Sequence, residues 1–391
     1  MTRLTHRMVL TVLSLLLLAT GPTTALAATP AELIATIRAV NKKGQGSPEA
    51  GKAVAELSAV GPESLLAVLR AFDGANPLAT NYLRSVAETI VDRALAAKAP
   101  LPQKSLEAFI GSLDNDPHAR RLAFEIVVRV DGSVTDRLIP GMLTDPNPVF
   151  RRQAVARLLD LAGRLNKERQ PRLAADLYRQ ALRGATDDDQ VQAIAKPLRS
   201  LGEKVDLPRH FGFLTQWNIV GPFDNTGGKG FAAVYAPESK LDLKATLKGK
   251  LGPATWKSYS TSHDFGILDI AKQIKPYKGA VMYCTTTFVS GSAQAIQFRL
   301  GTPNAWKLWV NGKQMFANEE YHRGMKIDQY SVPVTLRAGA NTILLKICQN
   351  EQTQDWAQRY QFQIRTCNKS GIAVLAADAS ARRTTARETQ P

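Results

Sequence analysis

The 391-residue chain carries 50 Lys and Arg against 34 Asp and Glu, a formal net charge of +16, and 44% of its residues are hydrophobic. This length accommodates two or three domains of about 100–200 residues each. The three cysteines, Cys284, Cys348 and Cys367, form no CxxC pair and have no His nearby in sequence, which argues against a structural zinc site. An odd number of cysteines leaves at least one thiol without an intrachain partner.

The first residues are typical of a secretory signal peptide: Arg3 and Arg7, an apolar run from Met8 to Ala19, and small residues before the cleavage point. An apolar run of about a dozen residues falls short of the roughly 20 that span a bilayer. We therefore expect residues 1–27 to be removed and the mature protein to be secreted or periplasmic, without a membrane span. No Cys stands at the cleavage point to make a lipoprotein.

From 28 to 207, apolar residues recur at helical spacing, which predicts an all-helical domain. In "NYLRSVAETIVDRAL" one face carries Leu83, Val86 and Ile90, and "VFRRQAVARLLDLAGRL" repeats the pattern. The boundaries carry Pro, Gly and Asp, as in "GANP", "DNDPHA" and "TDPNPV". The Arg pairs of "DNDPHARRLAFEIV" and "LTDPNPVFRRQAVARLL" lie 31 residues apart, and these segments resemble HEAT repeats. The resemblance implies an α-solenoid that offers a surface to a protein partner.

Near Pro208 the apolar period changes to two, and strand-like runs follow without helices between them. Ile296, Phe298 and Leu300 alternate with polar residues, which predicts a sheet with one face inside. Several such strands predict an antiparallel β-sandwich over 208–375, and Pro333 predicts an edge strand or bulge. Residues 376–391 are rich in Ala, Ser, Thr and Arg, which is typical of a disordered tail.

The segments "WKLWVNGKQMF", "DQYSVPVTLRAGANTILLKICQN" and "WNIVGPFDN" resemble a galactose-binding-like jelly roll of bacterial exported proteins. Domains of this type accompany many carbohydrate-active proteins, and most bind rather than catalyse. The resemblance implies loops at one end of the sandwich that contact carbohydrate.

In "WKLWVNGKQMF", Asn311-Gly312 predicts a type I′ turn between two strands, because both residues tolerate positive φ. Leu308 and Val310 share one strand face, which we expect to be core, whereas Trp309 points to the opposite face. Trp306, in the segment "GTPNAW", stands where we expect a loop.

The candidate carbohydrate contacts are Asn304, Trp306 and Trp309, together with Tyr321, His322 and Arg323 of the loop "ANEEYHRGMK". Aromatic, donor and acceptor groups in one loop are what a site for a polar ligand requires. Each has a plainer alternative, which is loop packing for Trp306 and a solvated loop for the cluster. His263-Asp264 in "TSHDFG" has no nucleophile beside it and is expected to form a turn.

The motifs of common enzyme and nucleotide sites are absent: HExxH, GxSxG, GxxxxGK[ST], GxGxxG and the EF-hand loop. We therefore expect no enzyme activity, cofactor or metal. Residues 209–391 carry 23 Lys and Arg against 12 Asp and Glu, compared with 25 against 22 in 28–208, which favours an anionic partner. The leading hypothesis is a secreted binding protein for carbohydrate or an anionic envelope polymer, without specific nucleic-acid recognition. The alternatives are an assembly protein without a glycan ligand and a hydrolase with an unrecognised site.

Overall fold

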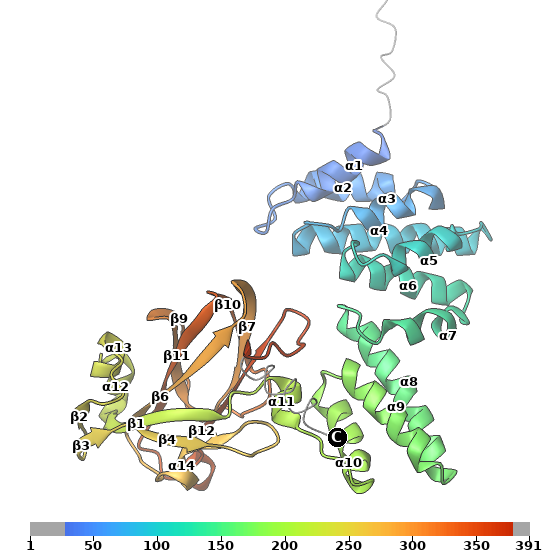
Figure 1. The fold of residues 1–391 in the computed structure, drawn as a ribbon. Coiled ribbons are helices and arrows are strands. Elements are labelled where there is room, and N and C mark those ends of the chain that lie inside the picture. Colours follow the sequence, from blue (N-terminus) through green and yellow to red (C-terminus); the bar gives the residue numbers. More distant parts are fainter. Residues whose placement is uncertain (1–27, 378–391) are drawn as a thin grey trace, which may run out of the picture. The chain divides into compact units, whose positions relative to one another are not determined.

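The computed structural model describes residues 28–377. The predicted signal peptide (1–27) and residues 378–391 of the predicted tail lie outside the described residues. The chain divides into two compact units between Asp131 and Gly132, and each unit is described by itself. Helices make up the first unit, whereas the second combines helices with antiparallel sheets (Figure 1). None of the described helices is long and apolar enough to cross a membrane.

The first unit consists of helices joined by short connections. They are α1 (Pro30–Arg38), α2 (Ser47–Leu57), η1 (Pro62–Ser64), α3 (Leu65–Arg70), α4 (Pro77–Ala96), α5 (Gln103–Gly111) and α6 (Pro117–Val130). The predicted apolar face of α4 is buried, since Leu83, Val86 and Ile90 are at most 2% exposed.

The helices begin where the sequence predicts a boundary. Thr29 caps α1 in a capping box with Glu32, and Asn76 and Asp116 accept backbone N–H bonds at the starts of α4 and α6. Proline follows each of these caps, where its missing N–H costs no helical hydrogen bond. Cap residues and proline therefore set these helix starts.

The second unit begins with helices α7 (Val134–Leu138), η2 (Ile139–Met142), α8 (Pro148–Lys167), α9 (Pro171–Gly184), α10 (Asp188–Ser200) and α11 (Leu207–Phe211). Helices α8–α11 share a hydrophobic core with Phe213 and, at its edge, with Phe265 and Ile327 of the strand region. The change from helix to strand occurs after α11, close to the predicted domain boundary at 207/208. That boundary stays a prediction.

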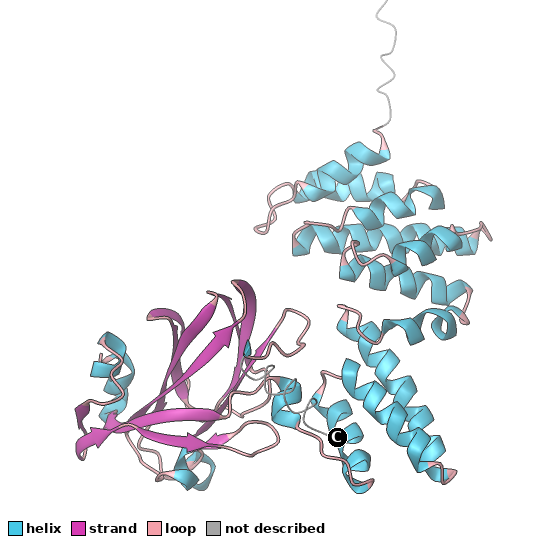
Figure 2. Ribbon diagram, in the orientation of Figure 1, coloured by secondary structure: helices cyan, strands magenta, loops and turns pink. Residues whose placement is uncertain are grey.

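The strands form three antiparallel sheets (Figure 2). The six-stranded sheet has the order β4-β1-β6-β11-β8-β9, the four-stranded sheet β10-β7-β12-β5, and β2 pairs with β3. Their bounds are β1 (Gln216–Asp224), β2 (Thr246–Gly249), β3 (Gly252–Thr255), β4 (Lys257–Ser260), β5 (Leu268–Asp269), β6 (Ala280–Ser290), β7 (Gln294–Gly301), β8 (Ala305–Val310), β9 (Lys313–Asn318), β10 (Tyr330–Leu336), β11 (Gly339–Gln349) and β12 (Gln361–Cys367). Between strands lie η3 (Thr226–Gly228), α12 (Lys229–Ala232), α13 (Ala236–Ser239), α14 (Ile270–Gln273) and η4 (Asp355–Ala357).

Both faces of the six-stranded sheet are covered. One face shares a single core with the four-stranded sheet, to which Leu308, Val310 and Phe298 contribute as the alternation predicts. The other face packs beneath α12, α13 and the β2–β3 hairpin (Figure 1), where Phe231 and Tyr235 contact the cluster. The six-stranded sheet therefore meets solvent at its ends and edges.

We call α12, α13 and the β2–β3 hairpin the covering segment. A buried lysine bonds this segment to the six-stranded sheet. Lys346 of β11 is fully buried, and its Nζ donates to the backbone oxygens of Phe231 (3.1 Å) and Ala233 (2.6 Å) and pairs with Glu238 (2.8 Å). Glu238 also accepts a hydrogen bond from the hydroxyl of Tyr283 on β6. These contacts satisfy each donor of the ammonium group, as burial of a charge requires.

Several predictions about turns and edges are confirmed. Asn311 and Gly312 have φ values of 53° and 80°, as a type I′ turn requires, and they join β8 to β9. Pro333 lies in β10, which is an edge strand. His263 and Asp264 lie in a non-regular segment with a turn, where Asp264 forms an ion pair with Arg199. All three cysteines are free and buried.

Candidate functional site

Five segments of the chain meet at one end of the six-stranded sheet. The register pairs Asp224 with Ala280 and Gln349 with Ala280, so β1 and β11 end where β6 begins. Likewise, β8 begins and β9 ends there, since Cys348 pairs with Ala305 and Trp306 with Asn318. We call the connections at this end the loop site; they comprise residues 225–228, 279, 302–304, 319–323 and 350–357.

The outermost aromatic group of the loop site is Trp356, whose side chain is 61% exposed on η4. Its ring meets the imidazole of His322 edge-on, with ring centroids 5.1 Å apart. His322 has a φ of 60°, and its Nε2 lies 2.6 Å from Oδ1 of Asn350. A large aromatic ring thus lies in solvent beside oriented polar groups.

Hydrogen bonds from buried and half-buried side chains stabilise the turn that carries Trp356. The side-chain amide of Gln349 and the ammonium group of Lys278 both donate to the backbone oxygen of Ala357, at 3.1 and 2.9 Å. Asn304, which is buried, donates to Gln349 Oε1 and to the backbone oxygen of Arg359, both at 3.2 Å. These bonds fix the turn without engaging the indole, so the ring is presented on a rigid base.

A second polar group lies next to this turn. Asn225 is fully buried and donates to the hydroxyl of Tyr321 (3.1 Å) and the backbone oxygen of Gln349 (3.0 Å). Burial raises the pKa of Tyr321 to about 12, so its hydroxyl stays protonated at neutral pH. Asn225 Oδ1 has no hydrogen-bond partner among the described residues.

Charged groups at the edge of the loop site are largely paired. Lys250 reaches Asp224 (2.9 Å) and the backbone oxygen of Gly279 (2.6 Å). Hydrogen bonds from Thr226 and Lys250 lower the pKa of Asp224 to about 2. Glu351 accepts the N–H of Gly227 at 2.6 Å. Within the described residues no group of three or more His, Cys, Asp or Glu could hold a metal ion.

The structure separates the six predicted contacts. Asn304, Tyr321, His322 and Arg323 all lie in the loop site, although Asn304 is buried within it. Arg323 pairs with Glu320 at 2.8 Å, and it is not among the hydrogen-bonding partners of Trp356 or Asn350.

Neither predicted tryptophan lies in the loop site. The expectation that Trp306 sits in a loop is wrong: it is the second residue of β8, is 0% exposed, and stacks on Phe316 with ring centroids 4.8 Å apart. It shares the core face with Leu308, so burial leaves its ring no surface for a ligand. Trp309 faces the other side of the sheet as predicted, but it is 6% exposed beneath the covering segment.

Sequence reasoning missed Trp356, Asn350 and Asn225. Trp356 does stand out in "NEQTQDWAQ", since a single large aromatic in a polar run without alternation has no core to join. Asn225 and Asn350 offer no comparable signal, because each depends on the pairing of β1 and β11 with β6.

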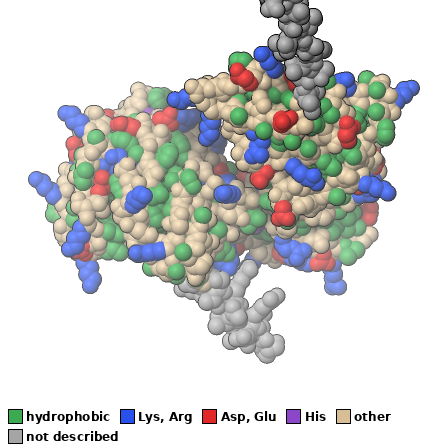
Figure 3. Space-filling model, turned by 90° about the horizontal axis from the view of Figure 1, so that it is seen from above, with side chains coloured by type: hydrophobic (Ala, Val, Ile, Leu, Met, Phe, Trp, Pro, Cys, Tyr) green, Lys and Arg blue, Asp and Glu red, His purple; other side chains and the backbone are tan. Residues whose placement is uncertain are grey.

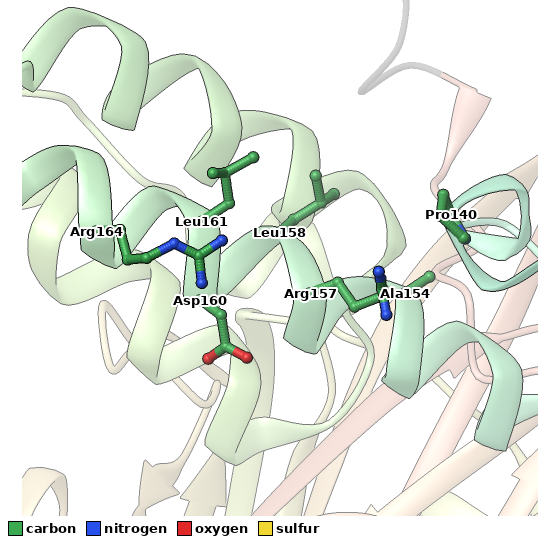
Figure 4. Close-up of a pocket in the computed structure, with 7 residues that line it drawn as sticks. All are labelled: Pro140, Ala154, Arg157, Leu158, Asp160, Leu161 and Arg164. Carbon is green, nitrogen blue, oxygen red and sulfur yellow. The ribbon is translucent and has the colours of Figure 1, made fainter. Parts of the chain in front are cut away.

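Among the surface hollows elsewhere in the second unit, two are relevant to binding. One is formed on α8 by side chains that include Leu158, Leu161 and Arg164, with Pro140 at its end (Figure 4). Leu161 belongs to the run "VFRRQAVARLLDLAGRL", which predicts a buried apolar stripe, but it is 38% exposed. The other hollow lies beside the bulge of β1.

No family model matches the chain, and no curated protein is similar to it. Among solved structures, a β-glucosidase from Kluyveromyces marxianus is similar at 10% identity over 44% of this chain and 18% of that chain, with a TM-score of 0.25. A β-glucuronidase from Ruminococcus gnavus has 12% identity over 40% and 29% (TM-score 0.23), and an α-xylosidase from Xanthomonas citri 12% over 40% and 18% (TM-score 0.21). The chain spans less than a third of each enzyme, and these TM-scores do not establish a shared fold.

Proposed function

We propose that the protein is a non-catalytic glycan-binding protein and that its loop site holds the carbohydrate. The observation that carries this proposal is the exposed indole of Trp356, fixed on a hydrogen-bonded turn beside His322 and Asn350. An aromatic face packs on the C–H face of a sugar ring, while nearby amides and imidazole bond its hydroxyls.

The proposal includes an architecture and a location. Residues 208–375 would form a galactose-binding-like jelly roll, supported by two antiparallel sheets with one core and by the Asn311-Gly312 hairpin. The helices would form a HEAT-like α-solenoid. Its support is that the first Arg of each pair, Arg120 and Arg151, is buried and donates to a backbone oxygen. Secretion rests on the predicted signal peptide alone.

The test is a glycan array followed by titration of the glycan that binds. Trp356→Ala should weaken binding at least about tenfold, because truncating a central tryptophan commonly costs 2 kcal/mol or more. Trp356→Phe keeps an aromatic face and should retain part of the affinity. The matched control is Leu173→Ala, which removes another side chain that is more than half exposed, on α9.

Three outcomes would contradict the proposal. Unchanged affinity in Trp356→Ala would remove the ring from the site, and absence of binding to any glycan would favour the assembly alternative. Turnover of a polysaccharide by the purified chain would make it an enzyme.

A purely electrostatic partner gives a different result. On the face drawn in Figure 3, Lys and Arg side chains are spread among other residues without forming one continuous patch. Binding to every polyanion that disappears with added salt would indicate this dispersed charge rather than the loop site.

The assembly alternative has one observation in its favour. The hollow on α8 exposes Leu161 next to Arg164 (Figure 4), while Arg157 pairs with Asp136 at 2.7 Å. Its apolar surface suits a protein segment with apolar side chains. A partner recovered by the wild type and lost in Leu161→Asp would support this role.

A further inference from the structure

A second concave site lies where β1 changes its neighbours. Strand β4 pairs with β1 only from Gln216 to Ile219, and a bulge between Val220 and Phe223 takes Gly221 and Pro222 out of register with β6. Strand β3 contacts β1 past the end of the β1–β4 pairing. A pocket opens between β3 and β4, and it is lined by the bulge, by 252–255, and by Lys257, Tyr259 and Tyr277. We call it the bulge pocket; its lining residues come mainly from β1, β3, β4 and the segment that follows α14.

Two phenol hydroxyls in the bulge pocket are unused. Tyr259 and Tyr277 are half-buried, and within residues 28–377 neither hydroxyl has a hydrogen-bond partner. Burial, and then the neighbouring Tyr277, raise the pKa of Tyr259, so this hydroxyl remains a donor at neutral pH. Both groups can therefore donate to a ligand.

The charged side chains at the bulge pocket are lysines, so the local charge is positive. Lys257 lines it, and the Nζ of Lys275 lies 6.0 Å from the ring centroid of Tyr277. In the described part of the chain neither lysine has a carboxylate partner, and no Asp or Glu lines the pocket. Two ammonium groups and two hydroxyl donors without a neighbouring carboxylate favour an anion, because charge-assisted hydrogen bonds are the stronger ones.

The remaining lining suits a ring with hydroxyl groups. The tyrosine rings, with Ile274 and Met282, provide apolar surface, while 252–255 contribute backbone polar groups. A ligand with an apolar ring face, several hydroxyls and one negative charge matches this set of groups.

We propose that the bulge pocket binds an acidic sugar residue through its carboxylate. Lys257 and the hydroxyls of Tyr259 and Tyr277 donate to the carboxylate, Lys275 adds attraction at the rim, and the sugar ring packs on the tyrosine side chains. The pocket is separate from the loop site and does not depend on whether that site binds a glycan.

The experiment is calorimetric titration of the full mature chain with oligogalacturonate and with the same oligomer as its methyl ester. The ester keeps the ring and removes the charge, so the free acid should bind at least about tenfold more tightly. Tyr277→Phe and Lys257→Gln should each lower the affinity for the acid at least about fivefold, as loss of a charged hydrogen bond predicts. They should leave binding of the ester nearly unchanged.

The matched control is Lys313→Gln, which removes an exposed lysine from β9, the other edge of the six-stranded sheet. Equal losses of affinity in Lys257→Gln and Lys313→Gln would show that only the net charge of the protein matters, and would overturn the proposal. Equal binding of acid and ester, or tighter binding of a sulfated oligomer, would overturn the carboxylate assignment.

Trp356→Ala separates the two sites. If this variant still binds the acid more tightly than the ester, the carboxylate is recognised in the bulge pocket, whether or not the loop site binds a glycan. If Trp356→Ala loses the preference for the acid and Tyr277→Phe keeps it, the acid binds at the loop site and the proposal is wrong. Tyr277→Phe removes one oxygen atom, and its circular dichroism spectrum should match the wild type.

Discussion

At the scale of single residues, Asp328 holds two arginines of neighbouring strands. It pairs with Arg365 of β12 (2.5 Å) and Arg299 of β7 (2.7 Å) and has a φ of 56°. Arg365 also donates to the backbone oxygens of Phe211 (3.2 Å) and Gly371 (3.0 Å). The side chain of Arg365 is only 2% exposed, so its charge depends on this carboxylate.

We predict that Asp328→Asn lowers the free energy of unfolding by about 3 kcal/mol at pH 7, because it leaves a buried guanidinium without its counter-charge. Asn tolerates positive φ, so the substitution tests the charge rather than the backbone. Urea unfolding of the variant and of Asp160→Asn, an exposed carboxyl on α8, would measure the difference. A loss in Asp328→Asn no larger than in the control would contradict the role of the pair.

The same pair gives a pH dependence. Burial of the Asp328 carboxyl opposes its ionisation, but hydrogen bonds and charge from Arg365, and then from Arg299, outweigh burial and hold its pKa below the ordinary value. A carboxyl with a lowered folded-state pKa stabilises the fold above the unfolded pKa of about 3.9, and this contribution is lost as the pH falls through the folded value. The gap between the wild type and Asp328→Asn should therefore shrink below about pH 4.

At the scale of elements, the β8–β9 hairpin depends on the backbone and on the side chain of Asn311. The turn needs positive φ at Asn311 and Gly312. In addition, Asn311 Nδ2 donates to Asn341 Oδ1 (2.9 Å), and its Oδ1 accepts the N–H of Thr342 (3.0 Å). Asn311 thus ties the hairpin to the start of β11.

Two substitutions separate these contributions. Asn311→Gly keeps the backbone conformation and loses the side-chain bonds, so it should cost about 1 kcal/mol. Asn311→Val adds the strain of a β-branched residue at positive φ and should cost about 1–3 kcal/mol more. Thermal unfolding of both variants measures the difference, and equal losses would show that the backbone requirement is unimportant.

The strands could be predicted because alternation is local. The quoted segments "WNIVGPFDN", "WKLWVNGKQMF" and "DQYSVPVTLRAGANTILLKICQN" each contain a strand, and the Asn-Gly turn and the edge position of Pro333 follow from backbone chemistry. Alternation also predicts that Trp306, two residues before Leu308, lies on the same strand face. The expectation that Trp306 is a loop residue did not take this spacing into account. The site was harder, because the approach of His322 to Trp356 depends on which strands are neighbours, and a single sequence does not reveal strand order.

At the scale of the whole molecule, the helices α8–α11 belong with the strands that follow them. Their core includes Leu207, Phe211 and Phe213, and it is bordered by Phe265 and Ile327 from the strand region. Arg151 of α8 donates to the backbone oxygen of Ser370 at 2.6 Å. The compact units accordingly separate at Asp131/Gly132 rather than at the change from helix to strand.

This division makes the last prediction. A fragment of residues 132–391 should fold as a stable, soluble protein, whereas a fragment of 208–391 should be markedly less stable or aggregate. The shorter fragment loses the helices that cover Phe211 and Phe213, and each large apolar side chain exposed costs about 1.5–3 kcal/mol. Urea unfolding and size-exclusion chromatography of both fragments are the measurements. Equal stability of the two fragments would place the domain boundary at 207/208 and make α8–α11 dispensable for the sheets.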